Sequence, residues 1–129
     1  MISEVLVIDA DCEAAIPELL RAGNAQVGWV VEPNGMGGLS RLRRSRPDLV
    51  IVNLQLPDMC GTRLVERIRK GRPNQVIVVT SNSSSVLCEK VARSLGVIAY
   101  LPKPVDVQVL EAVISGAIQG VGGWMEQAV

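Results

Sequence analysis

Five apolar runs, each rich in β-branched residues, recur along the chain at fairly regular intervals. They are Val5–Asp9, Gln26–Val31, Leu49–Asn53, Val76–Thr80 and Val97–Leu101. The segments between the runs have helical periodicity. It is clearest in the last one, where the apolar residues follow an i, i+3, i+4, i+7, i+8 pattern through Leu110, Val113, Ile114, Ala117 and Ile118. Alternating strands and helices predict an α/β domain with a parallel sheet, right-handed crossovers and helices on both faces.

The helices are not equally well marked. Leu87, Val91 and Leu95 give a helical stripe after the fourth strand, and the loop Ser81–Ser85 offers N-cap residues. Pro17 is tolerated in the first helix only if that helix begins near Glu13, where backbone donors are free.

Three glycines crowd the start of the second helix: Gly35, Gly37 and Gly38. Each costs about 1 kcal/mol relative to alanine inside a helix. We expect this helix to be short or mobile.

Length and composition limit the class of protein. A chain of 129 residues fits one domain, which we place at residues 1–118, followed by a Gly-rich tail or linker start at 119–129. No Phe is present, so the core must consist mainly of Val, Ile, Leu and Ala. The formal net charge is zero, and no apolar run approaches membrane-spanning length, so we expect a soluble cytoplasmic protein.

The cysteines suggest no special chemistry. Cys12, Cys60 and Cys88 are odd in number and lack CxxC spacing, so free thiols are favoured over a disulfide framework or a zinc site. A redox pair of Cys12 and Cys60 near the end of the sheet would need close approach and a lowered thiol pKa, and the sequence indicates neither.

One polar residue ends the third apolar run. Leu49–Val52 is continuous and apolar, Asn53 follows it, and Pro57 and Gly61 then mark a loop before the next helix. Parallel sheets place their ligand sites at the carboxyl ends of such strands. Asn53 is therefore the first candidate site residue.

The segment PDLVIVNLQLPDMCG, residues 47–61, resembles the phosphoacceptor strand of the bacterial response-regulator receiver domain, and the resemblance extends over roughly residues 3–118. It implies the flavodoxin-like (βα)5 fold with strand order 2-1-3-4-5. It also implies an aspartate at the position of Asn53, which accepts a phosphoryl group from a histidine kinase. A carboxamide is neutral and a poor nucleophile, so the residue that defines the family's chemistry is missing.

Other positions match the family in part. Asp9 occupies the first acidic position, whereas Ala10 replaces the second acid, whose carboxylate ordinarily binds Mg²⁺. Asp11 lies one residue too late and is better interpreted as a cap of the first helix. The remaining matches implied by the resemblance are the backbone carbonyl of Gln55 for the metal, Thr80, Ser81 and Lys103 for the phosphoryl group, and Tyr100 as the aromatic switch.

Losing the acids at positions 10 and 53 changes the local formal charge from about −2 to about zero by this comparison. Mg²⁺ favours octahedral oxygen coordination with one or two carboxylates, so we expect weak or absent Mg²⁺ binding, no other cofactor and no enzymatic activity.

Simpler interpretations exist for the matching residues. Lys103 is expected to pair with Asp9 or to donate to the Asn53 carbonyl. Thr80 is also an ordinary strand residue, and Tyr100 could be a surface aromatic. Asp58 is favoured as a solvated turn residue over a surrogate phosphoacceptor.

Basic residues gather in two neighbouring segments. They are Arg41, Arg43, Arg44 and Arg46 in the first, and Arg63, Arg67, Arg69, Lys70 and Arg72 in the second. The second and third helices should be neighbours, so a basic face is expected. This face has no interleaved aromatic residues and no evident recognition helix, which favours a solvated basic face over nucleic-acid binding by this domain.

The hypothesis we favour is a phosphorylation-independent signalling module, a pseudo-receiver. It would contact a signalling partner or a fused output domain through the fourth helix, fifth strand and fifth helix, the surface that also offers a route to a homodimer. One alternative is a conventional phosphoacceptor in which Asn53 is an engineered substitution. Another is a flavodoxin-like cofactor-binding protein, although the acidic, glycine-free loop at residues 10–13 would repel phosphate.

Overall fold

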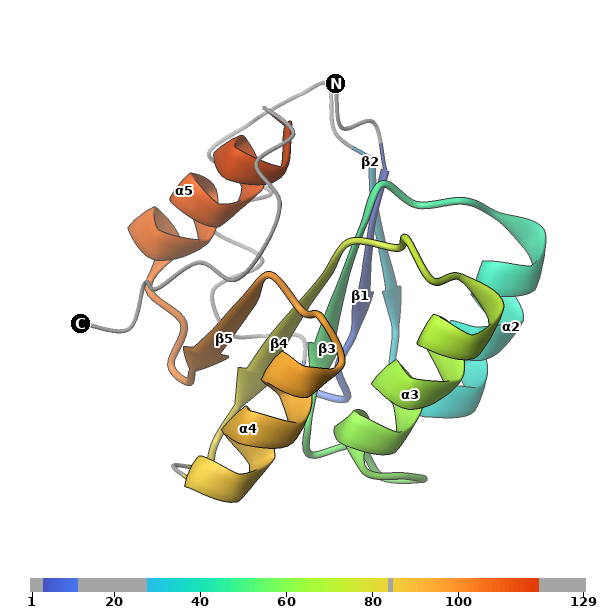
Figure 1. Cartoon of the computed structure of the whole chain (residues 1–129). Helices are drawn as coiled ribbons and strands as arrows, with labels where there is room; N and C mark the ends of the chain where they lie inside the picture. The colour runs from blue at the N-terminus through green and yellow to red at the C-terminus, as the bar shows by residue number, and fades with distance from the viewer. Residues whose placement is uncertain (1–3, 12–27, 84, 119–129) are drawn as a thin grey trace.

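The computed structural model describes residues 4–11, 28–83 and 85–118, which form a twisted parallel sheet with helices on both faces (Figure 1). The strands are β1 (Glu4–Ile8), β2 (Gly28–Glu32), β3 (Leu49–Asn53), β4 (Ile77–Ser81) and β5 (Ala99–Pro102). The helices are α2 (Gly35–Arg44), α3 (Gly61–Gly71), α4 (Val86–Ser94) and α5 (Val107–Ile118). All pairs are parallel and the order is β2-β1-β3-β4-β5, which confirms the expected topology.

Side chains that alternate along the strands divide the core between the two faces of the sheet. Val5 and Val7 belong to the cluster that includes residues of α5, whereas Leu6 and Ile8 belong to the cluster that includes residues of α2, α3 and α4. Figure 1 shows the same division, with α5 on one face and the other three helices on the opposite face. Strands buried on both faces explain why their sequences are continuous apolar runs.

The observed strands lie within two residues of the expected bounds where the structure describes them. β3 coincides with the prediction, and β5 begins two residues later than expected. The register pairs Asn53 with Thr80 and Ile8 with Val52. The residues that follow β1 and those that end β3 and β4 are therefore close neighbours.

The second helix is not short, contrary to the sequence-based expectation. α2 runs for ten residues, and the side chain of its N-cap Asn34 accepts a hydrogen bond from the Gly37 backbone. A Cβ atom added at Gly38 would lie 2.3 Å from Ile8 Cδ1, far inside van der Waals contact. The glycine thus allows α2 to pack closely on β1, a gain that helix propensity does not include.

The helical stripe predicted after β4 is only partly correct. α4 is present and Ser85 caps it by accepting from the Cys88 backbone, as expected. However, Leu87 is 71% exposed and Val91 is 38% exposed, while Ala92 is buried. The helix therefore turns a different side toward the sheet.

Several predictions lie outside the described residues: the first helix with Glu13 and Pro17, the position of Cys12, and the tail at 119–129. The helices within the described ranges include none with the length and hydropathy that crossing a bilayer requires.

Candidate functional site

Four buried polar residues of the described chain gather at the carboxyl end of the sheet. They are Asp9, Asn53, Thr80 and Ser81, each at most 5% exposed. Asp9 follows β1, Asn53 ends β3, and the other two end β4. Parallel strands bring their carboxyl ends to one edge, so residues far apart in sequence share one site.

Asp9 lies at the centre of the site. Its Oδ2 atom accepts a hydrogen bond from Lys103 Nζ at 2.7 Å, and both side chains are less than a tenth exposed. Its Oδ1 atom accepts from Asn53 Nδ2 at 3.1 Å and from the backbone N–H of Asp11 at 2.9 Å. Of the two partners expected for Lys103, the structure shows the Asp9 carboxylate and not the Asn53 carbonyl. Both oxygens of the Asp9 carboxylate are satisfied.

Asn53 acts as a donor in this site. Its Nδ2 atom also donates to the backbone carbonyl of Gln55 at 3.1 Å, so both amide hydrogens are used. Rotating the amide by 180° would place its oxygen against the Asp9 carboxylate, so this orientation is the only one with compatible charges. An ionised aspartate at position 53 would lose both donations and face a second carboxylate.

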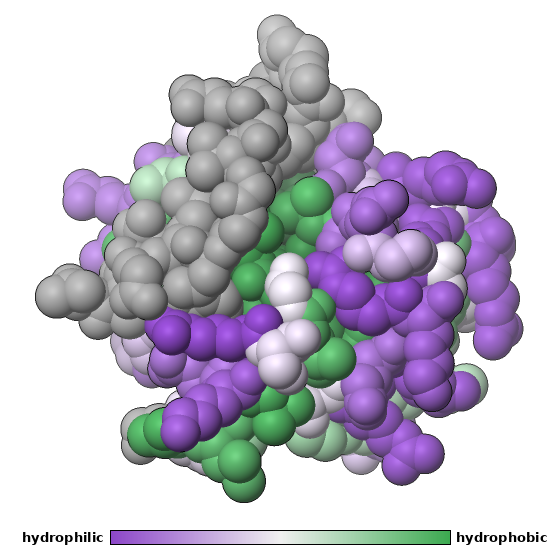
Figure 2. Space-filling view, viewed as in Figure 1, coloured by the Kyte–Doolittle hydropathy of each residue, from purple (hydrophilic) through white to green (hydrophobic). Residues whose placement is uncertain are grey.

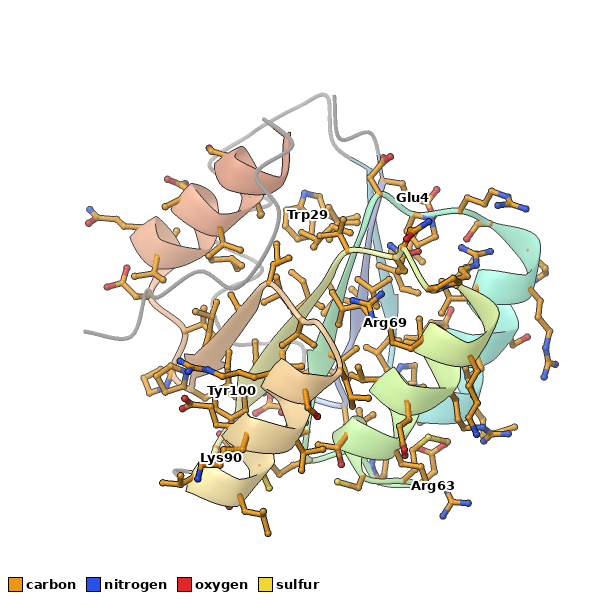
Figure 3. All side chains as sticks on the ribbon, viewed as in Figure 1. Glu4, Trp29, Arg63, Arg69, Lys90 and Tyr100 are labelled. Carbon is orange, nitrogen blue, oxygen red and sulfur yellow. The ribbon has the colours of Figure 1, made fainter. Side chains whose placement is uncertain are left out.

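Three buried polar atoms of the residues expected in the site have no partner within the described part of the chain: Asn53 Oδ1, Thr80 Oγ1 and the hydroxyl of Tyr100. Tyr100 is 7% exposed, so its interpretation as a surface aromatic was wrong. The ring is buried because β5 packs it against the cluster shared with α2, α3 and α4. Figure 3 shows Tyr100 between β5 and α4.

Gln55 links two loops through its side chain, which the sequence did not reveal. Its Nε2 donates to Ser81 Oγ at 3.2 Å, and its Oε1 accepts from the Asn82 backbone at 2.9 Å. The loop after β3 is thereby tied to the loop after β4. The one signal available in the sequence was a carboxamide, which offers a donor and an acceptor together.

Asp58 is more than the solvated turn residue predicted from the sequence. Its carboxylate accepts from the backbone N–H groups of Gly35 at 2.8 Å and Met36 at 2.9 Å, at the first turn of α2. These hydrogen bonds, that of Gly35 first, hold the pKa of the Asp58 carboxyl below its ordinary value. Asp58 therefore anchors the loop after β3 to α2, because helix N-termini favour anionic acceptors.

Cys60 and Cys88 are free thiols. Cys60 is exposed, and a hydrogen bond with Thr62 Oγ1 at 3.0 Å lowers the pKa of its thiol. Cys88 is half-buried in α4.

The residues present do not fit Mg²⁺. Within the described ranges, no three residues of the Asp, Glu, His and Cys types lie together in a group that could hold a metal. Ala10 is exposed and offers no side-chain ligand, while Asp9 is already bound to Lys103 and Asn53. The carbonyl of Gln55 accepts from Asn53. Among the described residues, the buried carboxylate available to an octahedral oxygen site is that of Asp9, and it is paired with Lys103.

The expected basic face is only partly solvated. Arg69 donates to the carbonyls of Leu95 at 2.7 Å and Gly96 at 3.0 Å, and burial lowers the pKa of its guanidinium. Arg72 donates to the Ser45 carbonyl at 2.7 Å, which confirms that the second and third helices are neighbours. Figure 3 shows Arg69 turned toward the body of the protein, whereas Arg63 extends outward from the first turn of α3.

Comparison with known proteins is consistent with this geometry. The family description "response regulator receiver domain" matches residues 5–115. The DNA-binding transcriptional regulator NtrC of Azospirillum brasilense is 32% identical over 120 residues, which are 90% of this chain and 24% of that protein. The transcriptional regulatory protein GlrR of Escherichia coli is 32% identical over 100 residues, 78% of this chain and 22% of that protein. The chain thus spans about a quarter of the length of these relatives.

Among solved structures, the receiver domain of a DNA-binding response regulator from Colwellia psychrerythraea superimposes with a TM-score of 0.82 at 20% identity. The match covers 90% of this chain and 98% of that domain. At this identity the likeness concerns the fold.

Proposed function

Because this chain belongs to the response-regulator receiver family, we propose that it is a pseudo-receiver, a signalling domain that works without phosphorylation at the usual position. The observation that carries the proposal is the closed network of Asn53, Asp9 and Lys103. The amide replaces the expected nucleophile, and the lysine expected to meet a phosphoryl group neutralises Asp9 instead. The ammonium group of Lys103 and the carboxylate of Asp9 neutralise each other, so the site needs no further anionic group for charge balance.

The absence of a second acid supports the proposal independently. A carboxylate at position 10 would be the direct metal ligand in the family, and Ala10 has none. Phosphoryl transfer needs positioning and charge neutralisation, which the metal ordinarily supplies. A nucleophile restored at position 53 alone should therefore react poorly. This also argues against the alternative of a conventional receiver with one engineered asparagine.

The decisive experiment compares phosphorylation of three proteins: wild type, Asn53→Asp, and Ala10→Asp/Asn53→Asp. Each is incubated with acetyl phosphate and Mg²⁺, and the intact mass is measured. In the reaction a carboxylate oxygen attacks phosphorus, and acetate leaves with the electrons of the broken P–O bond. We expect no added phosphoryl group in wild type, little in the single variant and clearly more in the double variant.

Circular dichroism of each variant provides the control for folding. Full labelling of Asn53→Asp alone would contradict the argument that the metal site is lost. Covalent labelling of the wild-type chain at the carboxyl edge of the sheet would overturn the proposal as a whole.

The partner surface we propose comprises α4, β5 and α5. It is supported by apolar residues that α4 leaves in solvent, Val86 at 67% and Leu87 at 71% exposed. Figure 2 shows hydrophobic surface at the end of the molecule where α4 begins. Since the relatives are longer regulators, a fused output domain or a separate signalling protein would cover this face, and a homodimer is the second option.

Thr80 and Tyr100 supply a candidate switch for such a surface. Tyr100 is packed inward, although its hydroxyl lacks a partner in the described chain. A partner can change the balance between an inward and an outward orientation of the Tyr100 ring only if it binds one of these two conformations more tightly. Light scattering of wild type and Leu87→Asp, with the exposed Met36→Asp on α2 as matched control, would test the surface for dimer formation. A dimer lost in both variants, or in neither, would exclude the α4 face as its contact.

A further inference from the structure

Positive charge is concentrated in one segment of this chain. Residues 41–72 hold nine of the thirteen basic residues and three of the thirteen acidic ones, a formal charge of +6 that the rest of the chain balances. Figure 2 shows strongly hydrophilic side chains gathered on the side where α2 and α3 lie. A neutral protein therefore presents a basic face, whose field attracts anionic groups.

Part of this charge serves the fold and part does not. Arg41 pairs with Glu32 at 3.0 Å, and Arg69 and Arg72 bind backbone carbonyls. By contrast, neither Arg43 on α2 nor Arg67 on α3 forms an ion pair with any acid of the described chain. Both side chains are exposed.

Arg43 and Arg67 border a groove of about 280 Å³ between the two helices. The half-buried Leu39 supplies the accessible apolar surface of the groove, and Leu42 and Ile68, which also line it, are buried beneath. Gly71 lines it as well, and a Cβ added there would meet no atom within 4 Å, so the space beside it is open. The groove thus combines an aliphatic base with unpaired guanidinium groups at its edge.

We propose that this groove binds an acidic, amphipathic helical segment of a partner protein. Aliphatic side chains of the segment would enter the groove beside Leu39, while its carboxylates would pair with Arg43 and Arg67, a geometry that guanidinium favours. Helix-in-groove recognition uses such spaced apolar anchors. This surface is separate from α4, β5 and α5, and it does not depend on the chemistry at Asn53.

Nucleic acid fits the groove less well than an acidic helix. A phosphate backbone would pair with the arginines but would leave the aliphatic lining against polar atoms. Single strands also need aromatic side chains for stacking, and the aromatic residues of the described chain, Trp29 and Tyr100, both lie away from α2 and α3 in Figure 3. Charge and lining together therefore favour a protein segment.

The test uses the whole chain and a fluorescein-labelled synthetic peptide of about 16 residues, in which Leu and Glu occupy opposite faces of a helix. Fluorescence anisotropy is measured at about 50 mM salt, where screening is limited. The variant Arg43→Glu/Arg67→Glu is compared with Lys90→Glu/Arg93→Glu, which makes the same change in net charge on α4. We expect about a tenfold loss of affinity in the first and less than about a twofold change in the second.

A second peptide, with every Leu replaced by Ser, tests the apolar half of the proposal and should bind at least about fivefold more weakly. Equal loss in the two charge-reversal variants would show attraction to net charge alone and overturn the inference. So would absence of binding, or tighter binding of a DNA duplex than of the Leu peptide. Salt-sensitive self-association that Arg43→Glu/Arg67→Glu abolishes, without peptide binding, would assign the groove to a second copy.

Discussion

The buried ion pair in the site allows a quantitative prediction for Lys103→Met. The substitution keeps the unbranched apolar stem but removes the ammonium group, leaving the Asp9 carboxylate about 5% exposed and without its cation. With an effective dielectric constant of about 20, two unit charges separated by the observed 2.7 Å attract each other by about 6 kcal/mol. The cost of desolvating the ammonium group cancels part of this attraction.

Asp9 keeps two donors in the variant, the amide of Asn53 and the backbone of Asp11. We therefore expect a loss of about 3 kcal/mol in the free energy of unfolding, at the low end of values for a broken buried pair. Urea unfolding at neutral pH, followed by circular dichroism, should show a midpoint about 2 M lower if the slope is about 1.5 kcal/mol/M.

The matched control is Arg93→Met on α4. Arg93 lies 3.4 Å from Glu89, and both side chains are about 40% exposed, so this change should cost less than about 1 kcal/mol. In Asp9→Asn/Lys103→Met both charges are gone, and the loss should be smaller than the sum of the single losses by about 2 kcal/mol. A cost below about 1 kcal/mol for Lys103→Met, or simple additivity in the double variant, would refute the reasoning.

Three further predictions concern packing, capping and an unsatisfied hydroxyl. Gly38→Ala should lower the free energy of unfolding by about 1–3 kcal/mol because its Cβ would overlap Ile8, whereas Gly71→Ala, with open space around it, should be neutral or stabilising in the same urea titration. Asp58→Ala should cost about 0.5 kcal/mol at pH 7. Because the folded-state pKa of Asp58 is lowered, its contribution is present above the ordinary aspartate pKa and is lost as the pH falls through the folded value. The difference from wild type should therefore shrink as the solution is acidified below the ordinary aspartate pKa, and a difference that stays constant with pH would contradict the anchoring role. Tyr100→Phe removes a buried hydroxyl that has no partner in the described chain and should not lower the midpoint, whereas a loss above about 1 kcal/mol would reveal a hydrogen bond that this structure lacks.

Several features of the site followed from local sequence or from the receiver resemblance. Asn53 ends an apolar run, and the parallel topology expected from strand–helix alternation places such an end at the ligand edge. The pairing of Lys103 with Asp9 was predicted because the receiver resemblance places both residues at that edge. The order of the strands came from the same resemblance, since alternation alone does not specify which strands are neighbours.

The contacts that join the loops could not be found in this way. Gln55 binds residues 26 and 27 positions away, and Asp58 binds α2 across 22 and 23 positions. Arg69 and Arg72 reach carbonyls between 26 and 30 positions away. A side chain that can donate or accept gives no indication of which distant backbone group will be in reach.

The sequence by itself determined the alternation of strands and helices and the neutral side chains of Asn53 and Ala10, because periodicity and side-chain chemistry are local properties. Only the tertiary structure decided that Tyr100 is buried, that α4 leaves Leu87 in solvent, and that Gly38 permits α2 to lie against β1. Those outcomes depend on how helices rotate and approach when they pack on the sheet. Packing is set by the combined shape of many residues and not by the pattern of any one segment.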